Sequence, residues 1–339
     1  MHNEIMHSEI MNSEMKTVEQ YSPFHSGELE IQRRVGVDER IKDIGRRVIR
    51  DHLLPQHQAF YQAQHMLLLA LVDSDGKPWP AVVAGSPGFV VALDPLHLRI
   101  DALPVGLSAT FDGAPIAELV VGAQVGVLGI DYSTRRRNRV NGRVISVDRT
   151  GFVLHVTQSF GNCPKYIQLR DTESSEAPGW RAQPVAGHFV PELNGEWRAL
   201  IEASDHFFIA SHYDRPGDEA HHGADVSHRG GKPGFVRIDA DGVLEFPDFA
   251  GNRFYNTLGN ISANGKAALL FIDFRCGSLL SMSGEARVDW RAADTSGFAG
   301  AERSVRFTSR DIRVYSRALP LRWRFREQSP ALEHTGHWS

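Results

Sequence analysis

The sequence predicts a mainly β protein of the α+β class, in which two similar β domains follow one another. The tetrapeptide Pro-Gly-Phe-Val occurs twice, at Pro87–Val90 and at Pro233–Val236. In the same register Gly126–Asp131 aligns with Ala268–Asp273, and a glycine follows each of these aspartates after eleven residues. Several matches in one register indicate internal duplication. A pair of domains has a junction between them, which is a favoured place for a ligand site.

Composition sets broad limits on what the chain can be. Its 339 residues are enough for two domains of ordinary size. The net charge of -4 gives no general attraction to nucleic acid or to an anionic membrane, so neither is expected as a partner. No apolar run approaches the ~20 residues that cross a bilayer. With only Cys163 and Cys276, the chain suits a reducing cytoplasm and lacks the cysteines of a disulfide framework or a four-cysteine iron–sulfur site.

The first half begins with helices and continues as strands. Residues 1–15 form a degenerate five-residue repeat, and we expect 1–23 to be a disordered leader. Apolar residues at 37, 41, 44 and 48 predict an amphipathic helix, and a shorter helix follows Pro55. From there the pattern indicates strands near 66–72, 81–84, 96–100, 124–130, 139–148 and 151–157. We place the first domain at 24–170.

A polar, proline-bearing stretch at 171–192 is predicted to be a linker. The second domain, 193–328, opens with a helix near Glu196 and continues with strands near 206–211, 234–238, 243–246, 268–274 and 279–289. Residues 314–326 could add a last strand, although Pro320 argues against it, and 329–339 is a tail. Closely spaced antiparallel strands joined by turns favour a barrel over a parallel sheet.

The segment from Gly251 to Asn260 carries the clearest chemical signal. On a helical wheel Arg253, Asn256, Thr257 and Asn260 form one polar stripe. A guanidinium, amides and a hydroxyl beside a helix N-terminus are donors that bind a phosphate dianion. The alternative is a solvated helix face. Because asparagine and threonine are poor interior helix formers, their concentration in one stripe favours the phosphate interpretation.

A second glycine-rich segment, Asp225–Val236, supplies Arg229 and Lys232 beside backbone that a ligand can approach closely. Alone it would be read as a basic hairpin turn. The corresponding first-half segment, 84–89, has no cation. We therefore predict the phosphate site in the second half.

These motifs resemble the pyridoxamine 5'-phosphate oxidase-like family of FMN-binding split barrels, and most of all its bacterial flavin-nucleotide-binding branch. The likeness spans 24–326 and rests on four segments: Thr134–Gly142, Ser159–Gln168, Asp225–Val236 and Pro247–Asn260. The resemblance implies two tandem split β-barrels with flanking helices, FMN at a barrel junction, and an FMN-dependent oxidoreductase. It does not fix the substrate.

The resemblance also assigns roles to individual residues. The phosphate would be held by Arg229, Arg253, Asn256, Thr257 and Asn260. The flavin edge would lie along Ser227 and His228. The first half would contribute Arg137 and Arg139 near flavin N1 and O2, and Asn162, Lys165, Tyr166 and Gln168 around the ring. For the arginines a solvated hairpin is an equal alternative, and no acid–base catalytic residue is identified.

Several expectations concern partners and alternatives. The arginines around Pro320 do not match the C-terminal motif of the pyridoxamine phosphate oxidases proper, so we do not expect the vitamin substrate. The electron donor would be NAD(P)H or a separate reductase, and a homodimer stays open. No metal site is predicted, because the loop with His221 and His222 lacks ligand spacing, and Cys163 is expected to be structural. The rival function is a non-catalytic flavin-nucleotide carrier, and a haem-binding split barrel is a more distant one.

Overall fold

The computed structural model describes residues 22–105, 119–174, 176–183, 185, 187–291 and 298–338. It is mainly β, as predicted, with antiparallel sheets of which none closes on itself within these residues. The first sheet contains β1 (Met66–Val72), β2 (Pro78–Ala84), β3 (Val90–Asp94), β4 (His97–Ile100), β5 (Gln124–Asp131), β6 (Arg136–Val147) and β7 (Phe152–Asn162). Its strand order is β2-β1-β5-β6-β7-β4-β3.

The second sheet contains β10 (His206–Tyr213), β11 (Gly223–Gly230), β12 (Arg237–Ile238), β13 (Leu244–Phe249), β14 (Lys266–Asp273), β15 (Ser278–Asp289) and β16 (Ala301–Tyr315). Its order, β11-β10-β14-β15-β16-β13-β12, repeats the order of the first sheet strand for strand, and β9 (His188–Phe189) is added on β16. A separate ribbon joins β8 (Leu169–Ser174) to β17 (Leu321–Glu327). The predicted domain boundaries stay a prediction.

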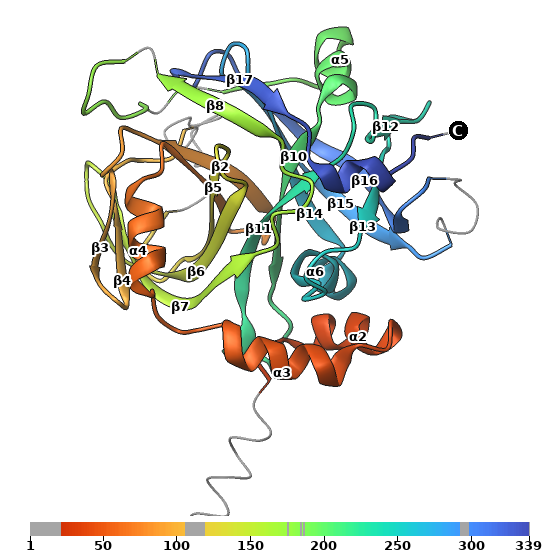
Figure 1. Ribbon diagram of the computed structural model, residues 1–339, viewed down its shortest axis with the longest axis horizontal. Helices are drawn as coiled ribbons and strands as arrows, with labels where there is room; N and C mark the ends of the chain where they lie inside the picture. Colours follow the sequence, from red (N-terminus) through yellow and green to blue (C-terminus); the bar gives the residue numbers. More distant parts are fainter. Residues whose placement is uncertain are drawn as a thin grey trace, which may run out of the picture.

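The helices lie around these sheets. They are α2 (Ser26–Arg34), α3 (Asp38–Val48), α4 (Pro55–Gln62), α5 (Gly195–Ala203) and α6 (Asn256–Asn264), with two short 3-10 turns, η1 (Glu219–His221) and η2 (Pro330–His334). Figure 1 shows α2 and α3 running together beneath α6 and the ends of β7 and β11. None of the helices in the described ranges is long and apolar enough to cross a membrane.

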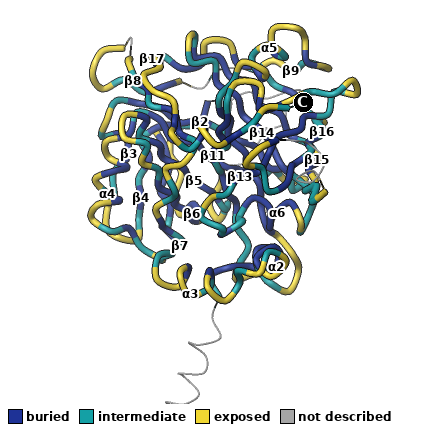
Figure 2. Tube along the Cα trace, turned by 45° about the vertical axis from the view of Figure 1, so that its right-hand side comes forward, coloured by how far each residue is buried: buried dark blue, intermediate teal, exposed yellow. Residues whose placement is uncertain are grey.

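Both faces of β1 and β10 are buried, which explains why β1 is entirely apolar and β10 has an apolar centre. Successive side chains of a strand point to opposite faces. Leu67 and Leu69 therefore enter the core of the first sheet, whereas Leu68 packs with Phe208 and Leu270 in a third core between the two sheets. The central strands are accordingly coloured as buried in Figure 2. The two halves are joined by a shared apolar core.

Some predicted elements differ from those observed. Residues 234–236 form a turn instead of a strand, because Gly234 has a φ of 85° and Phe235 N–H donates to the Lys232 carbonyl. The expected last strand is divided into β16 and β17, with Pro320 between them. The predicted leader, 1–23, lies outside the described residues except for its last two.

Candidate functional site

A pocket lies where β5, β6 and the end of β7 from the first half meet β11, β13 and α6 from the second. Its cavity proper is about 100 Å³, within about 840 Å³ of space when the open mouth is included. Most of the predicted site residues line it together: Arg137, Arg139, Asn162, Lys165, Tyr166, Ser227, His228, Arg229, Arg253, Asn256 and Thr257. Segments far apart in the sequence thus converge on one place.

The first turn of α6 forms one wall of this pocket. The preceding residue, Tyr255, and Arg253 before it both have a φ of 64°, in the left-handed region that non-glycine residues rarely adopt. Within the described chain no side chain caps the helix. The backbone N–H groups of its first turn are therefore left for a ligand, and the N-terminal end of the helix dipole favours an anion there.

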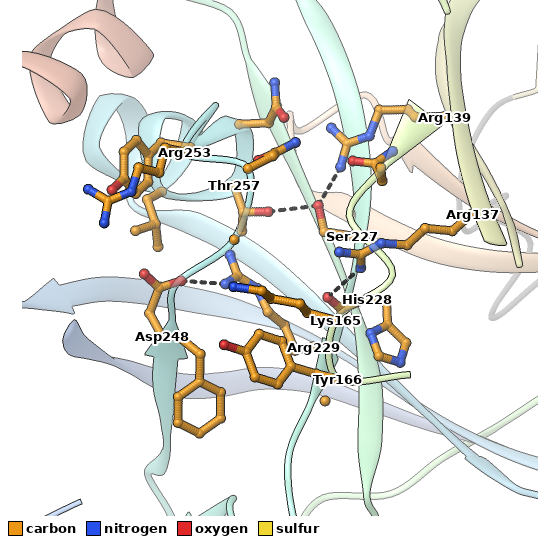
Figure 3. Close-up of a pocket in the computed structure, with 18 of the residues that line it drawn as sticks. Arg137, Arg139, Lys165, Tyr166, Ser227, His228, Arg229, Asp248, Arg253 and Thr257 are labelled. Carbon is orange, nitrogen blue, oxygen red and sulfur yellow. Dashed lines mark hydrogen bonds and ion pairs between the residues drawn. The ribbon is translucent and has the colours of Figure 1, made fainter. Parts of the chain in front are cut away.

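Three of the pocket arginines are already neutralised by carboxylates. Arg139, 3% exposed, pairs with Asp225 and also donates to the Val226 carbonyl at 3.0 Å. Arg229 pairs with Asp248, and Arg253 lies 3.3 Å from a Glu302 oxygen. In Figure 3 Arg253 lies across the pocket from Arg137 and Arg139.

Two other pocket cations, Arg137 and Lys165, form no ion pair with any described carboxylate. The Arg137 guanidinium donates to the carbonyls of Cys163 (2.7 Å) and His228 (3.4 Å). Burial lowers the pKa of Arg137 to about 10, and the charges of nearby arginines lower it too, so it stays protonated at neutral pH. Lys165 is exposed and extends across the pocket (Figure 3).

The pocket also contains uncharged donors and rings. Thr257 Oγ1 donates to Ser227 Oγ at 3.0 Å, and the rings of Tyr166 and Phe249 lie 5.1 Å apart. Burial holds the pKa of His228 well below its usual range, helped by nearby His206 and Arg137. His228 is therefore neutral at neutral pH.

Several lining side chains carry a buried polar atom with no hydrogen-bond partner among the described residues. These atoms are Arg139 Nε, Asn162 Nδ2, His228 Nε2, Arg229 Nε and Tyr255 Oη. Buried polar atoms are nearly always paired in native proteins. Their concentration around one pocket marks it as a polar site.

Two predicted residues are not brought to the pocket lining. Asn260 is fully buried behind it and donates to Ser211 Oγ (3.0 Å) and Asp225 Oδ2 (2.9 Å). The Gln168 amide contacts the Gly231 carbonyl (3.5 Å) and the backbone N–H of Ser329 (2.7 Å).

Residues that the sequence analysis did not single out also shape the site. Asp248 holds Arg229, and Asp225 holds Arg139. Glu28 of α2 accepts a hydrogen bond from the side chain of Asn256. Asp248 lies in Pro247–Asn260, one of the segments that carry the resemblance, so the sequence does contain a signal for it. No signal in the sequence pointed to Glu28.

Comparisons with known proteins are weak. No family model matches this chain, and no curated protein does. Among solved structures, HupZ from Group A Streptococcus aligns with a TM-score of 0.26 and 16% identity, over 35% of this chain and 91% of HupZ. A putative pyridoxamine 5'-phosphate oxidase from Lactobacillus delbrueckii aligns with a TM-score of 0.24 and 20% identity, over 33% of this chain and 95% of that protein. Another putative pyridoxamine 5'-phosphate oxidase, from Corynebacterium glutamicum, aligns with a TM-score of 0.25 and 16% identity, over 38% of this chain and 94% of that protein. These values do not establish membership of that family.

Proposed function

We propose that this chain is an FMN-binding flavoprotein that holds one FMN in the pocket between its two halves and acts as an FMN-dependent oxidoreductase. The observation that carries the proposal is the uncapped N-terminus of α6, which faces a pocket with Arg253 on its rim. Main-chain N–H groups together with a guanidinium are suited to a phosphate dianion. The unpartnered polar atoms of lining residues such as Asn162 and Arg139 are suited to the acceptors of the flavin ring.

Bound FMN would supply the hydride or electron transfer, and the side chains would bind and tune it. Arg253, Thr257 and the first turn of α6 would hold the phosphate. Arg137, which stays charged in a partly buried position, would face flavin N1 and O2 and favour the reduced anion. Lys165 and Tyr166 would border the ring. Electrons would come from NAD(P)H or from a separate reductase.

We further propose that the two sheets are tandem split barrels derived from one ancestor, and that only one of their two junctions binds FMN. Val83 lies four residues before Pro87, as Arg229 does before Pro233. By the same register Val82 and Ala81 occupy the positions of His228 and Ser227.

The cations of the first half likewise have uncharged counterparts. Arg137 is six residues after Asp131, and Leu279 is six after Asp273. Val82 and Leu279 belong to the apolar core between the sheets. The second junction therefore offers no cationic site at these positions.

The test is a visible spectrum of the purified protein, followed by NAD(P)H addition without oxygen. The proposal expects a flavin spectrum from the purified or FMN-loaded protein, and bleaching when the electron donor is added. A protein that binds no FMN, or that carries haem instead, contradicts it. A flavin that stays oxidised with NAD(P)H, with a reductase and with chemical reductants in turn supports the carrier alternative.

A further inference from the structure

A second cavity, of about 910 Å³, lies on the first half, away from the flavin pocket. It is open to solvent on one side and is bordered by α4, the start of β1, the turn after β5 and the β8–β17 ribbon. This volume is within the range of small-molecule sites in proteins, ~300–1,000 Å³. The proposed flavin chemistry makes no use of it.

Three aromatic side chains border it. Phe60, Tyr132 and Trp323 all line it, and each is less than a tenth exposed. The Trp323 ring is fixed by the ring of Phe274, whose centroid lies 4.5 Å away. Fixed rings of this kind favour a flat, apolar ligand body over a flexible chain.

An exposed cation without an acidic partner also lines the cavity. Arg136 lies over the Phe60 ring at 5.4 Å and forms no ion pair among the described residues. The two carboxylates of the lining differ: Asp171 is paired with cations, whereas Asp131, which lies opposite Arg136 in the β5–β6 ladder, forms no ion pair among the described residues. Asp131 accepts hydrogen bonds from the hydroxyls of Ser133 and Thr134, both at 2.6 Å, and Asp171 pairs with Arg324 and Arg326.

His65 adds one more unsatisfied group, since its buried Nδ1 has no partner in the described part of the chain. A planar guanidinium matches a carboxylate with two parallel hydrogen bonds, and a ligand polar group can pair with the imidazole. We propose that this cavity binds a planar aromatic anion, with its ring among Phe60, Tyr132 and Trp323 and its carboxylate on Arg136.

Contacting side chains connect the second cavity to the flavin pocket, and through them the bound anion would act as an effector of the flavin. Tyr132 lines the cavity, and its hydroxyl lies 3.1 Å from His206 Nε2. His206 stacks on His228 with ring centroids 4.9 Å apart, and His228 lines the flavin pocket. The effect on flavin rests on the proposed function, but the binding itself does not.

The experiment is calorimetric titration of the purified full-length protein with 2-naphthoate and with its neutral analogue 2-naphthamide. We expect 2-naphthoate to bind the wild type more tightly than 2-naphthamide does. Arg136→Ala should weaken 2-naphthoate binding by about tenfold or more and leave 2-naphthamide binding unchanged. The matched control is Arg143→Ala, an exposed position further along β6, which should bind 2-naphthoate as the wild type does.

Saturating FMN separates the two sites. If 2-naphthoate binding survives it, the aromatic anion occupies the second cavity, and if FMN displaces the probe, the proposal is overturned. Absence of 2-naphthoate binding, equal affinities of the two probes for the wild type, or equal weakening by Arg136→Ala and Arg143→Ala overturns it as well. If Arg136→Ala does not fold, the same titrations are made with Arg136→Gln, which should also bind 2-naphthoate more weakly than the wild type does. The comparison of 2-naphthoate with 2-naphthamide on the wild type needs no variant. A protein that binds 2-naphthoate but no FMN rejects only the flavin assignment.

Discussion

Arg253 and Tyr255 adopt a backbone conformation that costs about 1–3 kcal/mol each for residues other than glycine. The two residues bracket the turn that sets the direction of α6. Such strain persists where the surrounding structure enforces it, and it concentrates at ligand sites. Here it orients an uncapped helix end toward a pocket containing several cations.

The role of Arg253 is tested by its replacement. Arg253→Ala should weaken FMN binding by at least about tenfold, because a charge-assisted hydrogen bond to phosphate contributes ~1.5–3 kcal/mol. Riboflavin, which has no phosphate, should bind the variant and the wild type equally. Arg253→Asn controls for strain, because asparagine tolerates the left-handed region. Equal loss of riboflavin and FMN in both variants would show that Arg253 acts on the fold and not on the phosphate.

Asp225 links the two halves of the chain. It pairs with Arg139 and accepts from Asn141 (2.8 Å) on β6, and it accepts from Asn260 (2.9 Å) on α6. Asp225→Ala would leave the buried Arg139 charge without its partner, which costs ~3–5 kcal/mol. Urea denaturation should show this loss, whereas Asp241→Ala, at an exposed turn, should change stability by less than about 0.5 kcal/mol. Similar denaturation midpoints for the two variants would refute the role given to Asp225.

The sequence predicted much of the pocket lining because those residues lie in two local motifs on each half. The sequence also predicted Asn260 and Gln168 at the site, but in the fold neither residue lines the pocket. Their partners, Ser211, Asp225 and Ser329, come from distant segments. A helical wheel shows that a polar stripe exists, but it does not show whether a strand covers part of it.

Among the elements, α2 has the closest link to the candidate site, since it packs directly on α6. Gly27 and Gly259 face each other there, and a Cβ added at Gly259 would lie 2.7 Å from the backbone N of Glu28. Glu28 in turn accepts from Asn256 at the start of α6. The position of α6 therefore depends on α2.

Gly259→Ala tests this packing. Glycine to alanine inside a helix normally stabilises by about 0.5–1 kcal/mol. Here we expect destabilisation by ~1–3 kcal/mol, because backbone atoms would have to move apart. The control is Gly195→Ala at the start of α5, where an added Cβ meets no atom of the described chain within 4 Å. Thermal denaturation that ranks Gly259→Ala as more stable than the wild type would contradict the packing argument.

The start of α2 should make the protein sensitive to acid. The Nδ1 atom of His25 accepts from the backbone N–H groups of Gly27 (3.1 Å) and Glu28 (3.4 Å), and burial lowers the pKa of His25 to about 4. The unfolded chain, with a histidine pKa near ~6.5, binds more protons between these two values. The contribution of neutral His25 to the free energy of unfolding is thus complete above pH ~6.5 and is lost as the pH falls toward 4.

His25→Asn keeps a capping acceptor but removes the titrating group. From pH 7 to pH 5 the wild type should lose up to about 2 kcal/mol more stability than the variant does. Burial raises the pKa of Glu28, so Glu28 makes the folded state more stable as the pH falls. Because Glu28 is present in both proteins, its effect cancels in the comparison. Urea unfolding at the two pH values measures the difference, and parallel losses would exclude His25 as the cause.

Strands with continuous apolar runs, such as β1, could be predicted from the sequence because both of their faces are buried. Strand β16 could not, because its arginines interrupt any apolar run. In the fold Arg306 pairs with Glu245 on the neighbouring strand β13 at 3.2 Å and with Asp239 in the turn after β12 at 2.8 Å. The identity of those partners depends on strand order, which a linear pattern does not show.

For the whole molecule, the repeated strand order of the two sheets is the feature that connects fold to proposed function. Duplication of a chain that binds ligand at a junction creates two equivalent junctions. In this chain one has cations, unpartnered donors and an uncapped helix, and the other has Ala81, Val82, Val83 and Leu279 at the matching positions. The sequence alone suggested this asymmetry, and the structure adds that Val82 and Leu279 pack in the core between the sheets.

Binding stoichiometry tests the central claim most directly. Flavin-free protein of known concentration would be titrated with FMN, and the bound fraction followed by fluorescence quenching and confirmed by equilibrium dialysis. We predict saturation at one FMN per chain, because the positions that match the cations of the proposed site are uncharged at the second junction. Saturation at two FMN per chain, or at one FMN shared by two chains, would contradict the account.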